Sequence, residues 1–323
     1  PIGEVSDLKI RPTGIRVGKM RVPLGVISMI YEARPNVTVD AAALCLKAGN
    51  AVLLRGGSEA YHSNRKLADL ISQALAVAGL PQEAVQLIPT TDRRSITALG
   101  ALDQYIDVLI ARGGEGLMRA LAGATVPLFR HGKGICHTYI DVDADLTKAL
   151  DIAFNAKVSR PGVCNAMETL LVHQKLAAQV LPALCQRFQE AGVELVGTPE
   201  VRALVPSVGA ASTEDWRTEY LGLKLAIKVV NNLDEAIEHI HRYGSLHSEA
   251  IITENYSSAR RFLETVDAAA VFVNASTRFN DGSEFGLGAE IGISTQKLHA
   301  RGPMGVRELT TTKFLVLGSG EVR

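Results

Sequence analysis

Short apolar runs alternate with longer helical patterns along residues 24–129 of the chain. The predicted strands are 24–30, 51–54, 85–88, 106–110 and 126–129, and the predicted helices are 37–48, 58–78, 92–99 and 114–121. Such alternation is typical of a parallel sheet covered by helices on both faces, because each helix carries the chain back to the start of the next strand. It therefore predicts an α/β fold.

The second half of the chain repeats this alternation less regularly. Predicted helices cover 146–155, 175–191, 233–241 and 257–266, and predicted strands cover 169–172, 226–230, 250–253 and 270–273. A glycine-rich region follows at 281–305, and a last apolar run at 312–317 predicts a strand. The loop 130–134 joins the two series and is the predicted boundary, since a length of 323 residues suggests about two domains.

The charge balance excludes several classes of partner. The chain has 34 Lys and Arg against 34 Asp and Glu, so it lacks the basic excess that binds nucleic acid or an anionic membrane. No uncharged apolar run approaches the roughly 18 residues of a membrane span. The four cysteines form no CxxC pair and have no metal-like spacing, which favours free thiols, no metal and a reducing, cytoplasmic location. These cysteines are Cys45, Cys136, Cys164 and Cys185.

Cys164 is the candidate nucleophile. It lies in a predicted turn with Pro and Gly, just before the strand 169–172. The reactive form of cysteine is the thiolate, so its ordinary pKa of about 8.5 must be lowered by cations or backbone donors. Arg160 and Lys157 are close in sequence. The alternative is a buried structural cysteine, which is our interpretation of Cys45 and Cys185 because both lie in apolar helical stretches.

Two turns with arginine and glycine follow predicted strands. Gly113 and Gly114 come after strand 106–110 and precede a helix, where backbone N–H groups can approach a phosphate. Arg55 and Ser58 follow strand 51–54, and an arginine there suits the 2′-phosphate of NADP. Each turn could instead be a simple strand-to-helix connection without a ligand. Together they favour a ligand, because open α/β sheets bind ligands at the carboxyl edge of their strands.

Several longer motifs resemble γ-glutamyl phosphate reductases, also called glutamate-5-semialdehyde dehydrogenases, of the aldehyde dehydrogenase superfamily. They are 31–40, 160–165, 273–279, 285–290 and 294–305. The resemblance covers essentially the whole chain. It implies an aldehyde dehydrogenase-like α/β fold, with a Rossmann-like cofactor domain, an α/β catalytic domain and a small β hairpin for oligomerisation.

The resemblance implies a domain for each part of the chain. We expect an oligomerisation hairpin at 1–22, an NADP-binding domain at 23–133, a catalytic domain at 134–307 and an oligomerisation strand at 308–323. Members of the family begin with additional helices, so we expect the first helices of the cofactor domain to be missing here. The resemblance also implies a homo-oligomer and leaves open a partnership or fusion with glutamate 5-kinase.

The resemblance further implies an activity, the second step of proline biosynthesis from glutamate. L-glutamyl 5-phosphate would be reduced with NADPH to L-glutamate 5-semialdehyde and phosphate. Cys164 would attack the acyl phosphate and form a thioacyl enzyme, while the backbone N–H of Cys164 and the side chain of Asn36 would stabilise the oxyanion. Arg160, Arg278 and Arg301 are candidates for the anionic groups of the substrate, and Glu290 for its ammonium group.

Some positions depart from the superfamily pattern. His131 occupies the place of a water-activating Glu, which favours phosphate over water as the acyl acceptor. Arg55 and Ser58 replace a Lys and a ribose-binding Glu of NAD-preferring relatives, which favours NADP. Glu219 resembles the Glu that binds the nicotinamide ribose. Two other hypotheses remain: a hydrolytic aldehyde dehydrogenase of broad range, and a non-enzymatic assembly role in which the hairpin and last strand pair between subunits.

Overall fold

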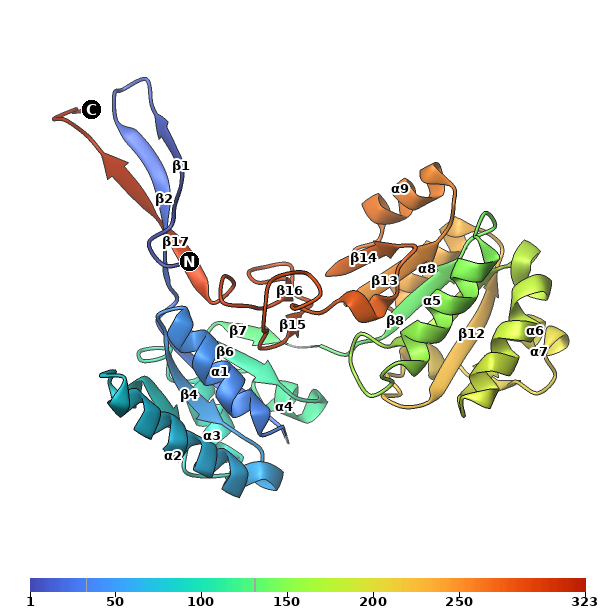
Figure 1. The fold of residues 1–323 in the computed structure, drawn as a ribbon, viewed down its shortest axis with the longest axis horizontal. Helices are drawn as coiled ribbons and strands as arrows, with labels where there is room; N and C mark the ends of the chain where they lie inside the picture. The colour runs from blue at the N-terminus through green and yellow to red at the C-terminus, as the bar shows by residue number, and fades with distance from the viewer. Residues whose placement is uncertain (33, 131) are drawn as a thin grey trace. The chain divides into compact units, whose positions relative to one another are not determined.

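The computed structural model describes residues 1–32, 34–130 and 132–323. The chain divides into two compact units, which we call unit 1 and unit 2 (Figure 1). Unit 1 comprises Pro1–His131 and Gly286–Arg323, and unit 2 comprises Gly132–Phe285. Each unit has its own sheet and its own core.

A five-stranded parallel sheet forms the centre of unit 1, in the order β5-β4-β3-β6-β7. Its strands are β3 (Val26–Tyr31), β4 (Ala51–Arg55), β5 (Val85–Leu87), β6 (Val108–Arg112) and β7 (Leu128–Arg130). All five strands were expected from their apolar runs. The order reverses at β3, because the chain builds outward through β4 and β5 and then returns to β6 on the other side.

Helices cover both faces of this sheet. They are α1 (Asn36–Lys47), η1 (Ser58–Ala60), α2 (Tyr61–Val77), η2 (Gln82–Ala84), α3 (Arg94–Gly100) and α4 (Glu115–Ala120). Successive side chains of a strand point to opposite faces. Met29 therefore packs in the core cluster of α1 and α2, whereas its neighbour Ile30 packs in the cluster of α3 and α4. The predicted α/β layering is confirmed.

The glycine-rich region returns to unit 1. Ile291, Ala300, Met304 and Leu309 enter the same core cluster as α1, and two short strands, β15 (Ile293–Ser294) and β16 (Gly302–Pro303), pair with each other there. The structure thus divides this part of the chain differently from the expected catalytic domain at 134–307. The reason is burial, because these apolar side chains complete the α1 face of the unit 1 sheet.

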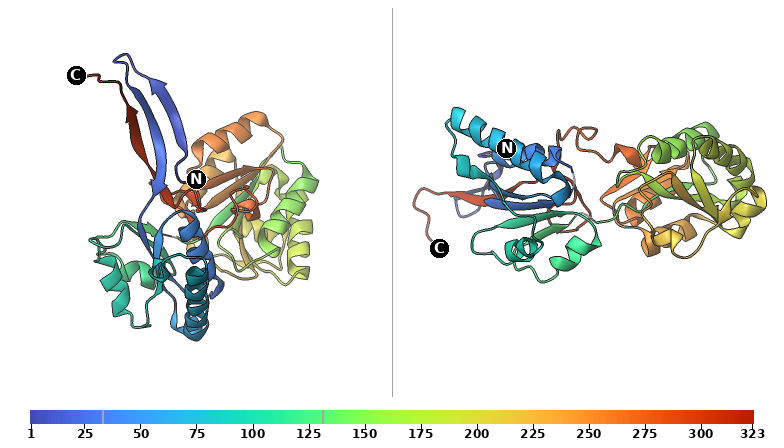
Figure 2. Two further views of the ribbon diagram at one scale, coloured as in Figure 1. Left: turned by 60° about the vertical axis from the view of Figure 1, so that its left-hand side comes forward. Right: turned by 90° about the horizontal axis from the view of Figure 1, so that it is seen from below.

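A three-stranded antiparallel sheet joins the two ends of unit 1 (Figure 2). Its strands are β1 (Val5–Ile10), β2 (Arg16–Pro23) and β17 (Thr310–Leu317). The central strand β2 pairs with β1 as a hairpin and with β17 along its whole length. The expected hairpin at 1–22 and the expected last strand are both present, and they form one sheet.

Unit 2 contains a seven-stranded parallel sheet in the order β11-β10-β12-β9-β8-β13-β14. Its strands are β8 (Cys136–Ile140), β9 (Met167–His173), β10 (Glu194–Gly197), β11 (Gly209–Ala210), β12 (Lys224–Val230), β13 (Ser248–Ile252) and β14 (Ala270–Val273). The sequence pattern did not predict β8, although it is fully buried. His137 and Tyr139 make its sequence look polar, but Nδ1 of His137 hydrogen-bonds Glu249 at 2.9 Å and the hydroxyl of Tyr139 donates to Asp141 at 3.0 Å.

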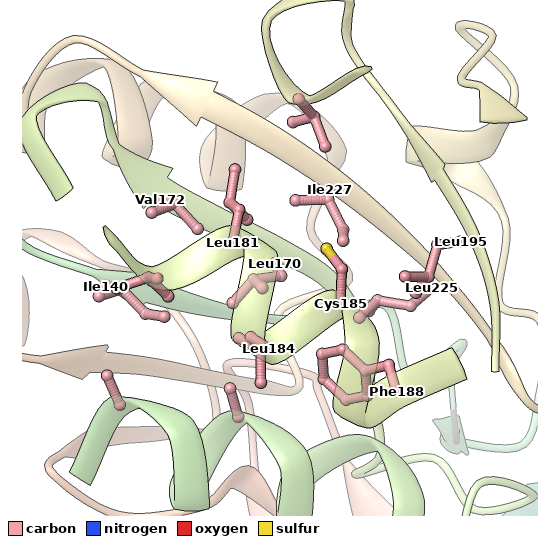
Figure 3. Close-up of a cluster of buried hydrophobic side chains, with 14 of the residues drawn as sticks. Ile140, Leu170, Val172, Leu181, Leu184, Cys185, Phe188, Leu195, Leu225 and Ile227 are labelled. Carbon is pink, nitrogen blue, oxygen red and sulfur yellow. The ribbon is translucent and has the colours of Figure 1, made fainter. Parts of the chain in front are cut away.

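The helices of unit 2 also cover two faces. They are α5 (Leu146–Val158), α6 (Gln174–Glu190), α7 (Pro199–Leu204), α8 (Leu233–Tyr243) and α9 (Tyr256–Thr265), with two short turns, η3 (Asp215–Arg217) and η4 (Thr277–Phe279). On one face, Leu184, Cys185 and Phe188 of α6 pack against Leu170 and Ile227 (Figure 3). On the other face, α8 and α9 pack against β8, β9 and β13. Among the described residues, no helix is both long and apolar enough to cross a bilayer.

Candidate active site

Cys164 lies in the turn between α5 and β9, and its side chain is half-buried. Cys136 contacts this turn, because its Sγ donates a hydrogen bond to the backbone oxygen of Cys164 at 3.1 Å. Burial raises the pKa of the Cys136 thiol well above its ordinary value, so this thiol remains a proton donor. Cys45 and Cys185 are buried, as expected for structural cysteines. Burial raises the pKa of each thiol to about 12.

Gly134 presses directly against the backbone of Cys164. A Cβ at position 134 would lie 1.8 Å from the carbonyl oxygen of Cys164, so only glycine permits this approach. The N–H of Gly134 donates to Oε1 of Glu219 at 2.8 Å. Burial raises the pKa of Glu219, and the Gly134 N–H and Lys133 oppose this rise. Glu219, Gly134 and Cys164 are therefore linked by contact within unit 2.

A polar clamp holds the residue next to Cys164. Arg278 donates from Nη1 to Oδ1 of Asn165, and from Nε to Oγ of Ser159 at 3.1 Å. Asn165 is buried and returns a hydrogen bond from Nδ2 to the carbonyl oxygen of Asn280 at 2.9 Å. Its own carbonyl oxygen accepts from Oγ1 of Thr277 at 2.7 Å. The turn η4 and the Cys164 turn thus form one hydrogen-bonded structure.

This clamp brings positive charge near Cys164. Burial lowers the pKa of Arg278, the neighbouring Arg160 lowers it further, and Asp281 and Cys164 oppose the shift. Arg278 therefore lies within electrostatic range of both Arg160 and Cys164. Two guanidinium groups beside a half-buried thiol can bind a carboxylate or a phosphate and can favour a thiolate.

The expected glycine turn lies where the strand order of unit 1 reverses, between β3 and β6. Gly113 and Gly114 follow β6, and the N–H of Gly114 donates to Oε1 of Glu32, which follows β3, at 3.1 Å. A Cβ at position 113 would lie 2.7 Å from the same carboxylate oxygen. Open α/β sheets bind ligands at such a switch point, so the residues fit a dinucleotide.

Arg55 and Ser58 lie at the end of β4, next to β3 in the same sheet. Arg55 is buried and donates from Nη2 to the carbonyl oxygen of Thr91 at 2.7 Å. Its Nε has no hydrogen-bond partner among the described residues. Burial lowers the pKa of Arg55, and Arg93 lowers it further. A buried guanidinium with an unused donor beside the exposed Ser58 fits the 2′-phosphate of NADP.

The remaining expected site residues that the structure describes belong to unit 1. Asn36 begins α1 in unit 1 and donates from Nδ2 to Oδ2 of Asp40 at 3.0 Å. Glu290 and Arg301 also belong to unit 1, and Arg301 lines a hollow of about 400 Å³ with Arg21 and Arg307. His131 lies outside the described residues. Unit 2 holds Cys164, Arg160, Arg278 and Glu219.

Sequence reasoning missed four residues that shape these sites: Glu32, Gly134, Cys136 and Asn165. Asn165 is adjacent to Cys164, and Glu32 lies inside the motif 31–40, so the sequence motifs contain both residues. Their partners, however, are more than 80 positions away. No local pattern indicates such pairings.

Comparisons with known proteins define the class of this fold. The model of the aldehyde dehydrogenase family matches residues 7–202, more than half of the chain. An acetylating aldehyde dehydrogenase from Geobacillus thermoglucosidasius has a similar fold, with a TM-score of 0.74 at 20% identity, over 95% of this chain and 78% of that one. The architecture is therefore that of an aldehyde dehydrogenase.

More similar relatives narrow this class. Proteins named γ-glutamyl phosphate reductase from Halothermothrix orenii and Moorella thermoacetica are each 60% identical to the chain, over 100% of its length and 78% of theirs. A crystal structure of γ-glutamyl phosphate reductase from Thermotoga maritima has a TM-score of 0.97 at 52% identity, over 100% of this chain and 78% of that one. The chain belongs to the γ-glutamyl phosphate reductases of the aldehyde dehydrogenase family.

Proposed function

We propose that the chain reduces L-glutamyl 5-phosphate to L-glutamate 5-semialdehyde and phosphate, with NADPH as the reductant. The observation that carries the proposal is the half-buried Cys164, whose turn contains Arg160 and is hydrogen-bonded to Arg278 through Asn165. A thiol nucleophile next to two cations suits an acyl phosphate, which carries both an electrophilic carbonyl carbon and an anionic leaving group. The names of the relatives support this substrate.

In the first step, the Cys164 thiolate attacks the carbonyl carbon of the acyl phosphate. A C–S bond forms, the C–O bond to phosphate breaks, and inorganic phosphate leaves with the electron pair. The backbone N–H of Cys164 and the side chain of Asn36 are the proposed donors to the oxyanion. The product of the step is a thioester on Cys164.

In the second step, the thioester is reduced, and the resulting thiohemiacetal collapses to the aldehyde and the free Cys164 thiol. Bound NADPH supplies the hydride for this step. Arg55 and Ser58 are proposed to bind its 2′-phosphate, and the backbone N–H groups of Gly113 and Gly114 its pyrophosphate, which would displace the carboxylate of Glu32 from the Gly114 N–H. Glu219 is proposed to bind the nicotinamide ribose through its carboxylate.

The charged groups at the two ends of the substrate need partners of both signs. Arg160, Arg278 and Arg301 are proposed for the phosphate and the α-carboxylate, because a guanidinium can donate two parallel hydrogen bonds to either group. Glu290 is proposed for the α-ammonium group. These assignments follow from charge type alone.

The sheet of β1, β2 and β17 is proposed to mediate homo-oligomerisation. It exposes large apolar side chains on both faces, Phe314 at 71% and Val316 at 56% on one face and Ile10 at 75% on the other. Apolar side chains clustered on an exposed sheet often mark a protein interface.

The proposal is tested in the reverse direction. Purified protein is incubated with glutamate 5-semialdehyde and NADP, with and without inorganic phosphate, and formation of NADPH is followed by absorbance. We expect activity that requires phosphate and that disappears in Cys164→Ala. NADPH formation at the same rate without phosphate would instead indicate a hydrolytic aldehyde dehydrogenase. Full activity of Cys164→Ala would exclude the thioester mechanism.

A further inference from the structure

A buried ion pair lies beneath the Cys164 turn of unit 2. Lys157, near the end of α5, and Glu168, near the start of β9, flank the turn in sequence, and their side chains are 0% and 1% exposed. Nζ of Lys157 lies 2.5 Å from Oε2 of Glu168. The reaction proposed above uses neither residue. Because desolvation offsets much of the attraction in a buried pair, stability alone is a weak reason for its presence.

The ion pair also contacts the segment 220–221, through the carboxylate oxygen of Glu168 that does not bind Lys157. Oε1 of Glu168 accepts from the backbone N–H of Leu221 at 3.2 Å, and the ammonium group of Lys157 lies 5.8 Å from the ring centroid of Tyr220. Leu221 has a φ of 52°, a conformation that leucine rarely adopts unless its surroundings hold it there. The contact with Glu168 supplies part of that restraint.

The segment 219–221 is connected to the nucleophile Cys164 through Gly134. Glu219 precedes these two residues, and its Oε1 accepts from the N–H of Gly134 at 2.8 Å. Gly134 in turn lies in contact with the backbone of Cys164. A shift of the segment 219–221 would therefore move the carboxylate of Glu219, and through it the residue that packs on Cys164.

We propose that Glu168 is a positioning residue that holds the segment 219–221, and thereby Glu219 and Cys164, in the reactive arrangement. The inference rests on the proposed function, in which Glu219 binds the cofactor and Cys164 is the nucleophile. The predicted effect passes through one hydrogen bond, from Leu221 N–H to Glu168.

Two matched double variants isolate that hydrogen bond. Lys157→Met with Glu168→Gln removes both charges but keeps a carbonyl oxygen that can accept from Leu221. Lys157→Met with Glu168→Leu removes both charges and the acceptor. Neither leaves an unpaired buried charge, which would be the main cause of misfolding. Tyr139→Phe removes one buried hydrogen bond on β8, to Asp141, and controls for lost stability.

Three measurements are compared: phosphate-dependent kcat and KM for NADP, the Kd for NADPH by fluorescence titration, and the rate of Cys164 alkylation by iodoacetamide, read by mass spectrometry. We expect the Gln double variant to stay within about threefold of the parent. The Leu double variant should lose about 10- to 100-fold in kcat/KM, since misplacement of about 1 Å can have that effect. Its Kd for NADPH should rise, and its alkylation rate should change.

A double-mutant cycle with Glu219→Ala tests whether Glu168 acts through Glu219. In that background, the Gln and Leu double variants should have the same Kd for NADPH, because the group through which Glu168 acts is gone. Equal behaviour of the two double variants in the parent background would overturn the inference. So would kinetic losses no larger than those of Tyr139→Phe at equal thermal stability.

If the proposed reaction is wrong, the results differ from those that would reject the positioning role of Glu168. A parent protein without phosphate-dependent activity contradicts the proposed reaction. The alkylation rates, which need neither cofactor nor substrate, still decide the positioning role. Equal alkylation rates in the two double variants would then reject it, and unequal rates would support it.

Discussion

Cys164 depends on neighbours that have no reactive chemistry of their own. Gly134 lies against its backbone, Cys136 donates to its carbonyl oxygen, and Asn165 ties its turn to Arg278 and Asn280. Reaction rates are sensitive to small displacements of a nucleophile. We therefore expect substitutions at these neighbours to lower activity even where they leave the fold intact.

Gly134→Ala gives the most direct test at this scale. The added Cβ would overlap the carbonyl oxygen of Cys164, at 1.8 Å, so one of the two backbones must move. We expect kcat/KM to fall by about 100-fold. Gly162→Ala is the matched control, because its Cβ would meet Leu221 at an ordinary 3.7 Å. Similar kinetic constants for the two variants would contradict this account of Gly134.

The pair of Lys157 and Glu168 predicts a pH dependence of stability. Burial raises the pKa of Glu168 from 4.5 to about 7, although Lys157 lowers it. Lys157→Met removes that opposing charge, so the pKa of Glu168 should rise further. In both proteins the folded carboxyl holds a proton between pH 4.5 and about 7 that the unfolded one has lost, so both lose stability alike as the pH rises. Above about pH 7 the parent's carboxyl ionises, and only the variant continues to lose stability.

The difference in unfolding free energy between parent and Lys157→Met should therefore grow as the pH rises above about 7, toward the raised pKa of Glu168 in the variant. Its slope should approach about 1.4 kcal/mol per pH unit at most. Urea denaturation at several pH values measures it. A difference that stays constant with pH would show that Glu168 does not titrate in this way.

At the scale of elements, the two sheets obey the same alternation of side chains. The central strands bury both faces, so β3 and β8 contribute to cores on opposite sides of their sheets. A single polar residue can hold neighbouring segments together. Asn50, in the turn between α1 and β4, accepts from Gly25 N–H at 2.9 Å and donates to the carbonyl oxygen of Leu309 at 2.8 Å.

Asn50→Ala should destabilise the protein through these two bonds. The buried Gly25 N–H and Leu309 carbonyl would lose their partner, at a cost of about 1–3 kcal/mol each. We expect a loss of about 2–4 kcal/mol in urea denaturation. Val77→Ala, at a side chain that is 92% exposed, is the control and should change stability by no more than about 0.5 kcal/mol. Equal losses in both variants would disprove this role of Asn50.

At the scale of the whole molecule, unit 1 is made from two segments that are far apart in the sequence. The last strand β17 pairs with β2 over eight positions, from Thr310–Pro23 to Leu317–Arg16. The resulting sheet exposes an apolar surface that the proposed oligomer would cover. Phe314 and Val316 contribute large exposed side chains to it.

Phe314→Glu with Val316→Glu should therefore reduce self-association. Charged side chains would be desolvated in an interface, whereas on a free surface they remain hydrated. Sedimentation velocity should show a shift to smaller species, with little change in thermal stability measured at high dilution. An unchanged mass distribution would place the interface elsewhere.

The periodicity of the chain by itself determined the α/β class, most of the strands and helices, and the separation into two alternating series. The Cys164 turn and the two Arg/Gly turns were also visible, because their residue types and their position after strands are local properties. The resemblance to γ-glutamyl phosphate reductases added the family, which the comparisons confirm.

Only the tertiary structure decided which distant residues meet. Strand β8 was not predicted, because its sequence looks polar, whereas in the fold His137 is buried against Glu249 of β13 and Tyr139 against Asp141. The contacts of Glu32 with Gly114, and of Glu168 with Leu221, join positions that no local pattern connects. Periodicity reports whether a side chain is buried, whereas the identity of its partner depends on how the sheets are ordered in space.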